Sequence, residues 1–171
     1  YDISNPSNPI YRSTISTNNS WAVALKDQFA YVADNENILV VNIQDLSSPE
    51  IITSINTGNA IKDLVIDDNK LYSAIGSDGV TLFDINNQSY PQFLGNYNTS
   101  SLANRLSIFE DKVAVSDWDD VEVLEVGSSS IELVGYKNTT RRTMAIATKG
   151  NYIYSAEWAS VQVFEYGPID G

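Results

Sequence analysis

The chain has 171 residues, of which 43% are hydrophobic, and this length and composition allow one sizeable core. Cysteine and histidine are absent, which excludes disulfides, thiolate metal sites and the commonest general base. Twenty-two acidic against ten basic residues give a formal net charge of −12, which should repel nucleic acid and anionic membranes. No apolar run approaches the ~20 residues of a membrane helix, so we expect no membrane insertion.

A sequence pattern recurs along the whole chain. Its clearest copy, YVADNENILVVNIQDLSSP, occupies residues 31–49, a partial copy, YDISNPSNP, occupies residues 1–9, and later copies start at Leu71, Val113 and Tyr154. One polar residue marks the register, in steps of 40, 42, 41 and 40 residues: Asp2, Asn42, Asp84, Glu125 and Glu165. A period of this size indicates a repeat architecture. Because the chain lacks an initial Met and begins part-way through a repeat, we expect a mature or excised piece.

The residues before each register position are apolar on both parities, as in Ile38 and Val40 with Val41 after them. They are mostly β-branched or aromatic, which predicts a strand covered on both faces. Only the position three before the register residue is mostly polar: Leu39, Thr81, Glu122 and Gln162. We therefore expect Leu82 to be buried and Thr81 to point the other way, at the polar position.

Each repeat divides into four strands, A to D. In the second full copy they fall at 61–66, 70–75, 80–85 and 92–98, separated by turns rich in Asp, Asn, Gly and Pro. Shorter A strands are expected at 22–25, 105–108 and 144–148. This pattern predicts an all-β propeller built of about four four-stranded antiparallel blades. We assign residues 1–171 to one domain, with repeats at 1–19 (partial), 20–59, 60–101, 102–142 and 143–171 (partial).

The repeat pattern allows two arrangements of the last blade. Residues 9–17 form an unused D strand that could complete the last blade and close a four-bladed ring. Alternatively, the chain is part of a larger propeller. Chain length does not decide between them.

Three segments carry a resemblance to a known family. YDISNPSNP, FAYVADNENILVVNIQDLSSP and GVTLFDINNQSYPQFLGNY resemble LVIVD-repeat proteins, whose repeat is named after its strand C. The match is strong in the first two and a half repeats and weakens in the third, where VGSSSIE replaces ISNPSNP. Such proteins are similar to β-propellers of bacterial and archaeal envelope or secreted proteins. The resemblance implies a scaffold or binding role and brings no set of catalytic residues.

The acidic residues offer several candidate sites. The register residues form a polar ring if they face one another, although a side chain that ends a strand by accepting backbone hydrogen bonds explains them better. The runs 34–37 and 117–120 are oxygen-rich, but neither matches a calcium-binding loop, so we expect solvated turns, no cofactor, and calcium only as an alternative. The pairs Asp117/Asp120 and Glu157/Asp117 are the candidates for carboxylate hydrolase chemistry.

A binding surface is the more informative prediction. Consecutive strands run antiparallel, so the D–A and B–C connections lie on one face of the propeller. That face gathers the tryptophans, arginines and carboxylates from which interface anchors are mostly drawn. The predicted binding residues are Trp21, Arg105, Asp117, Trp118, Asp119, Arg141, Arg142, Glu157 and Trp158, centred on the last two blades.

The functional expectation follows from these points. We expect a non-catalytic scaffold that binds a protein or a glycan at the bacterial or archaeal cell envelope, in the periplasm, on the cell surface or in the extracellular space. The alternatives are a carboxylate- or metal-dependent hydrolase at the propeller mouth and a purely structural repeat without a ligand.

Overall fold

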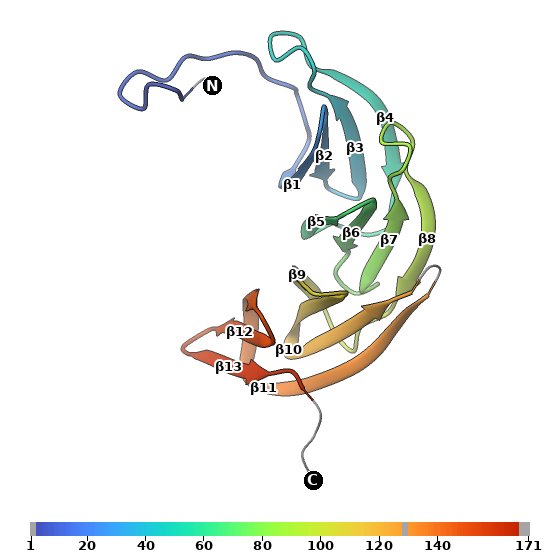
Figure 1. The fold of residues 1–171 in the computed structure, drawn as a ribbon, viewed down its shortest axis with the longest axis vertical. Helices are drawn as coiled ribbons and strands as arrows, with labels where there is room; N and C mark the ends of the chain where they lie inside the picture. Colours follow the sequence, from blue (N-terminus) through green and yellow to red (C-terminus); the bar gives the residue numbers. More distant parts are fainter. Residues whose placement is uncertain (1–2, 128–129, 168–171) are drawn as a thin grey trace.

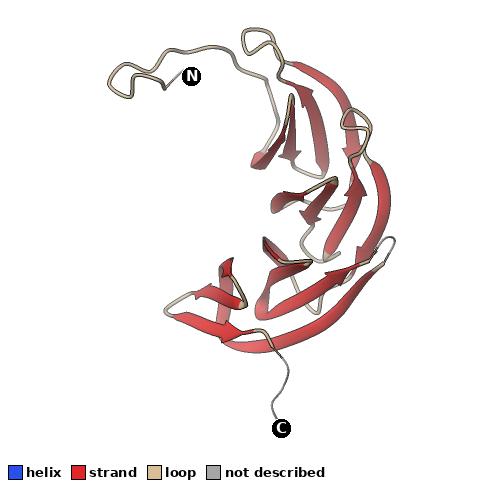
Figure 2. Ribbon diagram, in the orientation of Figure 1, coloured by secondary structure: helices blue, strands red, loops and turns tan. Residues whose placement is uncertain are grey.

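The computed structural model describes residues 3–127 and 130–167. This part of the chain is all-β, and its antiparallel blades follow one another along an open arc (Figures 1 and 2). It contains no helix long and apolar enough to cross a membrane. The predicted all-β class and the antiparallel blades are confirmed.

The first two blades are separate four-stranded sheets in which each strand pairs with the next along the chain. In blade 2, the predicted strands agree with the observed strands within two residues at each end. The bounds are β1 (Ser20–Lys26), β2 (Phe29–Asp34), β3 (Asn37–Asn42), β4 (Glu50–Asn56), β5 (Asp63–Asp67), β6 (Lys70–Ala74), β7 (Val80–Asp84) and β8 (Gln92–Tyr97).

Blades 3 and 4 share one five-stranded sheet of order β13-β12-β11-β10-β9. Its strands are β9 (Ala103–Phe109), β10 (Lys112–Val126), β11 (Ile131–Lys149), β12 (Tyr152–Glu157) and β13 (Val161–Glu165). The first part of β10 pairs with β9 and its last part pairs with β11, so β10 holds strands B and C of blade 3. Likewise, β11 holds strand D of blade 3 and strand A of blade 4.

The predicted turn at 117–120 therefore lies inside β10. Trp118 has a φ of 52° there, as Asn35 has a φ of 57° in the corresponding turn of blade 1. The ladder stays continuous because Trp118 also pairs with Thr143 of β11. This cross-pairing joins the two blades, which the repeat pattern alone did not predict.

The hydrophobic core lies between successive blades. Ile38 and Val40 of β3 pack against residues of blade 2 such as Leu64, and the next two interfaces repeat this arrangement with Val80 and Leu82 and then with Val121 and Val123. Leu82 is fully buried, as predicted.

The predicted environment of Thr81 is wrong. Its side chain is also buried, and its hydroxyl donates a hydrogen bond to Asn96 Oδ1 at 2.7 Å. The reason is that neighbouring structure covers both faces of strand C, so a polar residue there must find a partner inside the protein.

The closed four-bladed ring is not the structure of the described residues. Strand β13 is the edge of its sheet, and Figure 1 shows the N-terminal segment leaving blade 1 without reaching the last blade. This segment contacts blade 1 instead: the Ser13 hydroxyl donates to Leu46 O, and Ile15 packs against the cluster that contains Leu39 and Val41. The open arc agrees with the alternative of a larger propeller.

Candidate functional site

The position eight residues before the register residue lies at or just after the end of strand B. In blades 1 to 4 it holds Asp34, Gly76, Asp117 and Glu157. In blade 1 the buried Asp34 carboxylate accepts hydrogen bonds from Asn19 N (2.6 Å), Asn18 N (2.9 Å) and Asn18 Nδ2 (3.0 Å). The Asn19 N–H is the main reason that the pKa of Asp34 lies below its usual range, with burial opposing it and Asn18 adding to it. Asp34 thus anchors the loop before strand A to the end of strand B.

Asp117 does the same work in blade 3. Its Oδ1 accepts a hydrogen bond from Thr99 Oγ1 at 2.8 Å, and its Oδ2 accepts from Ser101 N at 2.7 Å and lies 2.9 Å from Ser100 Oγ. Its side chain is fully buried. Asp117 was predicted as part of a docking surface, but a partner cannot reach it, because the loop before strand A covers it.

Two further carboxylates lie beside Asp117. Asp120 and Glu122 are 6% and 2% exposed. Asp120 Oδ2 lies 2.8 Å from the same Ser100 hydroxyl, and Glu122 Oε1 accepts a hydrogen bond from Ser100 N at 3.0 Å. The second oxygen of each, Asp120 Oδ1 and Glu122 Oε2, is buried without a hydrogen-bond partner. One oxygen from each of the three carboxylates lies within 4.8 Å of the other two.

The electrostatics of this cluster differ from those of Asp34. The pKa of Asp120 is raised to about 6 and that of Glu122 to about 7; burial is the main cause, hydrogen bonds from Ser100 oppose the shift, and the neighbouring carboxylate of Asp117 contributes to it. Among the ion pairs of residues 3–127 and 130–167, none includes Asp117, Asp120 or Glu122. Three carboxylates therefore share a buried site, and no cation of the described residues forms an ion pair with them.

A surface pocket opens onto this cluster. It has a volume of about 460 Å³, enough for an ion with several waters, and Asp120 and Glu122 line it together with Tyr97, Asn98 and Asn138. Burial raises the pKa of Tyr97, and the charges of Glu122, Asp117 and Asp120 add to the effect. Solutes can thus approach the two carboxylates from the side of strand D.

The predicted aromatic and arginine residues do converge on the last two blades. The Arg142 guanidinium lies 4.4 Å from the centre of the Trp118 ring, a cation–π geometry, and Trp158 N donates a hydrogen bond to Arg142 O at 3.1 Å. The Trp158 side chain is 68% exposed, whereas Trp118 is half-buried. Both tryptophans therefore remain accessible in part, and their neighbour Arg142 is exposed.

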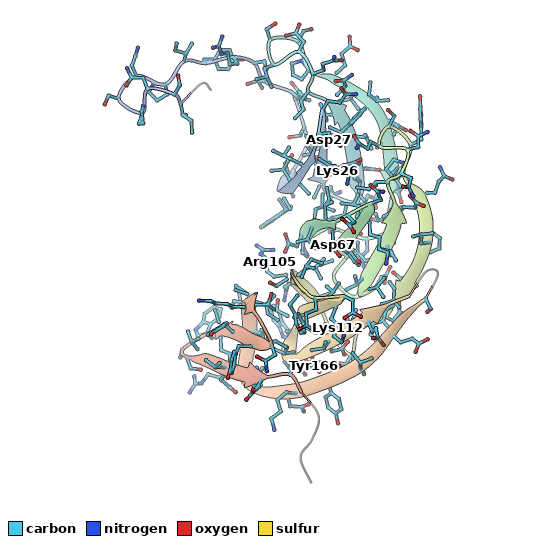
Figure 3. The ribbon with its side chains drawn as sticks, in the orientation of Figure 1. Lys26, Asp27, Asp67, Arg105, Lys112 and Tyr166 are labelled. Atoms are coloured by element: carbon cyan, nitrogen blue, oxygen red, sulfur yellow. The ribbon has the colours of Figure 1, made fainter. Side chains whose placement is uncertain are left out.

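The other predicted binding residues are more scattered. Arg105, on the inner side of the arc in Figure 3, donates hydrogen bonds to Lys62 O and Asn104 O, and Lys62 lies over the exposed Trp21 ring at 5.5 Å. Asp119 and Arg141 are exposed. Glu157 is buried, and its Oε2 accepts a hydrogen bond from Ser160 Oγ at 3.1 Å. The exposed part of the predicted surface is thus Trp158 with Asp119, Arg141 and Arg142 and, farther along the arc, Trp21.

The register residues do not form a functional ring. Asn42 Oδ1 accepts a hydrogen bond from Gln44 N, and Asp84 Oδ1 accepts one from Asn86 N, so both end strand C as predicted. Glu125 lies 3.7 Å from Lys112 Nζ, and Glu165 accepts from Asn151 Nδ2. Asp2 lies outside the described residues.

Sequence reasoning missed Glu122. Its position was noted as mostly polar, but no role was assigned to it. The available signal was a carboxylate inside a strand that is apolar on both parities, where Leu39 occupies the same place in blade 1. A charged residue in a strand covered on both faces is buried and needs a partner.

Comparison with known proteins places the chain in a family. The LVIVD repeat pattern matches residues 1–17, 18–57, 58–99 and 140–163, which is more than half of the sequence. The chain belongs to the LVIVD repeat family. The LVIVD match leaves out residues 100–139, the part of blade 3 that contains Asp117, Asp120 and Glu122. A search of curated proteins found no match.

Solved structures with the same fold include β-propellers of low sequence identity. The computationally designed Ika4 protein is 16% identical, with a TM-score of 0.75 over 89% of this chain and 94% of that one. The designed Ika8 protein is 17% identical, with a TM-score of 0.73 over 86% and 46%. The Cps50 (Swd1) β-propeller domain of Myceliophteria thermophila is 13% identical, with a TM-score of 0.72 over 86% and 54%. This chain therefore spans about half of the last two. At these identities the likeness shows the fold alone.

Proposed function

We propose that this LVIVD repeat protein is a non-catalytic scaffold that binds a protein partner through its last blade, at the cell envelope or in the extracellular space. The fold supports a scaffold role. The envelope or extracellular location is supported by the resemblance of the repeats to those of envelope and secreted propellers.

One observation carries the proposal. Val161 and Val163 of β13 are 68% and 56% exposed, whereas the corresponding Val121 and Val123 of blade 3 are 2% and 4% exposed. In the earlier blades the following blade covers these positions. This apolar face of the last blade is therefore suited to pack against other protein, either a partner or a further blade of a larger propeller, and Trp158 lies in the turn just before β13.

The chemistry of this surface favours a protein over a glycan. Exposed Tyr152 and Tyr154 of β12 belong to the same blade as the two valines, and Arg142 lies beside Trp158. Aliphatic, aromatic and arginine side chains in one place are typical of protein interfaces. A sugar-binding surface depends instead on aromatic platforms with polar neighbours, and the valines contribute little to it.

The test is a comparative capture experiment. The immobilised wild-type chain, a Val163→Asp variant and a Trp158→Ala variant are each incubated with the envelope fraction of the organism that produces the protein. The matched control is Tyr90→Ala, which removes an aromatic ring that is 55% exposed in the turn before β8. A protein partner should be retained by the wild type and the control and lost with Val163→Asp.

The affinity measurement then decides the outcome. With the purified partner, Trp158→Ala should weaken binding at least about fivefold, which corresponds to the usual threshold of about 1 kcal/mol for an interface anchor. Equal capture by all four proteins would contradict the proposal. So would quenching of tryptophan fluorescence by soluble oligosaccharides that requires Trp158, because a glycan would then be the ligand.

A further inference from the structure

We propose that Asp117, Asp120 and Glu122 of blade 3 form a calcium-binding site. This inference is independent of the proposed partner surface, because it concerns a buried site reached from the side of strand D. It rests on two buried oxygens without partners, on the position of a shared hydroxyl and on the distances among the three carboxylates.

Two oxygens of the cluster have no hydrogen-bond partner. Asp120 Oδ1 and Glu122 Oε2 are buried and accept no hydrogen bond, on side chains that are more than nine-tenths buried. A buried carboxylate oxygen without a donor or a cation is costly, so native proteins rarely leave one in place. Here two such oxygens belong to one cluster.

Ser100 lies between two of the carboxylates. Its hydroxyl oxygen lies 2.9 Å from Asp117 Oδ2 and 2.8 Å from Asp120 Oδ2. A hydroxyl has one proton and can donate it to only one of these oxygens at a time. The cluster therefore lacks one more donor, and a cation that contacts both carboxylates supplies the missing positive charge.

The ligand set selects the ion. All available atoms are oxygens, and the chain has no Cys or His, so soft or imidazole-preferring metals have no suitable ligand. Calcium binds oxygens at about 2.3–2.6 Å, so two of its ligands can be at most about 5 Å apart. The limit of 4.8 Å among the three carboxylates meets this condition.

The pocket completes the coordination. Calcium takes six to eight oxygen ligands in flexible geometry, more than one oxygen from each of the three carboxylates provides. The pocket beside Asp120 and Glu122 admits waters and includes the neutral side chains of Asn98 and Asn138. Magnesium demands a stricter octahedral geometry and gives up its waters reluctantly, which fits irregular ligands on one strand less well.

The three carboxylates occur together in only one of the four blades. The positions of Asp117, Asp120 and Glu122 hold Asp34, Asn37 and Leu39 in blade 1, Gly76, Gly79 and Thr81 in blade 2, and Glu157, Ser160 and Gln162 in blade 4. Only blade 3 combines three carboxylates. The fold does not need them there, since three other blades form without them.

The experiment uses the full chain, stripped with EDTA and passed over a chelating resin. Titration with CaCl₂ should show one site per chain by calorimetry. At a calcium concentration a hundred times the dissociation constant, the melting temperature should rise by about 5–10 °C. MgCl₂ at the same concentration should give a smaller shift.

Variants locate the site. Glu122→Gln should weaken calcium binding at least about tenfold, because it removes one of three charged ligands. Glu132→Gln is the matched control: it changes the same charge on an exposed side chain of the paired strand and should leave binding unchanged. Should Glu122→Gln fail to fold, Asp120→Asn and terbium luminescence sensitised by the nearby Tyr97 provide the same information.

Three results would overturn the proposal. The first is no response of the wild-type chain to calcium in either calorimetry or melting. The second is a calcium response that Glu122→Gln and Asp120→Asn retain in full. The third is an equal or larger response to magnesium, which would contradict the assignment to calcium.

Discussion

Blades 1 and 3 place an aspartate at the same position and use it in different surroundings. In blade 1, Asp34 accepts three hydrogen bonds from the loop before strand A, and the residue at the Glu122 position is the apolar Leu39. In blade 3, Asp117 makes the corresponding bonds to Thr99 and Ser101, but Asp120 and Glu122 lie beside it with unpartnered oxygens.

The difference separates structure from function. The aspartate at the end of strand B fastens a loop, and blade 1 shows that one carboxylate is enough for this. The two extra carboxylates of blade 3 destabilise the fold, because no protein cation in the described part of the chain balances their burial and mutual repulsion. In the calcium-site proposal, the bound cation removes this cost.

Transplanting the charge gives the largest expected effect. Leu39→Glu places the blade 3 residue in blade 1, where Leu39 is 9% exposed and belongs to an apolar cluster with Ala30 and Val41. Burying an unpaired carboxylate there should lower the free energy of unfolding by about 3–5 kcal/mol, measured by urea denaturation. A loss below about 1 kcal/mol would mean that strand C tolerates charge in any blade, and the contrast with Glu122 would disappear.

The reverse change should act in the opposite direction. In the presence of EDTA, Glu122→Leu removes a buried carboxylate that forms no ion pair, together with its one hydrogen bond from Ser100 N, and should raise the free energy of unfolding by about 1–3 kcal/mol. Addition of calcium should not raise the free energy of unfolding of this variant further, because the Glu122 carboxylate that binds the ion is missing. Destabilisation in EDTA would contradict the view that Glu122 is a burden on the metal-free fold.

The loop anchor of blade 1 should respond to pH. The folded-state pKa of Asp34 lies below its unfolded value, so the carboxylate stabilises the fold above the unfolded pKa of about 3.9, and this contribution is lost as the pH falls through the folded-state pKa. Asp34→Asn should therefore cost about 1 kcal/mol at pH 6. The difference in melting temperature from the wild type should shrink below about pH 4; a difference that stays constant from pH 6 to pH 3 would argue against the anchor.

Asp120→Asn should have the smallest effect on stability. The residue becomes the asparagine that blade 1 carries at position 37, and one like-charge repulsion disappears. In EDTA the free energy of unfolding should change by less than about 1 kcal/mol, while calcium binding weakens. A large loss of stability without calcium would assign Asp120 a structural role like that of Asp34.

The sequence was sufficient for the fold because the repeat signal is carried by local patterns. Apolar residues on both parities, such as Val80 and Leu82, identify a covered strand, and turn residues locate its ends. The open arc did not follow, because the contacts of the N-terminal segment, such as Ser13 with Leu46, depend on distant parts of the chain. The sequence did not predict the pairing of Trp118 with Thr143, which joins blades 3 and 4, for the same reason.

The candidate site was only partly accessible from the sequence. The convergence of Trp118, Arg142 and Trp158 followed from the alternation of strand directions. The burial of Asp117 did not, because it depends on a loop that folds over the strand end. Glu122 was overlooked because a polar residue at its position was interpreted as lying on a polar side, whereas both sides of strand C are covered.

The most direct measurement for blade 3 is an anomalous difference map from crystals of the full chain grown with calcium. The account predicts one peak in contact with the carboxylates of Asp117, Asp120 and Glu122, and none at Asp34, whose oxygens already have donors. Absence of a peak at Glu122 in crystals that contain calcium elsewhere, with the three carboxylates paired to one another or to water alone, would contradict it.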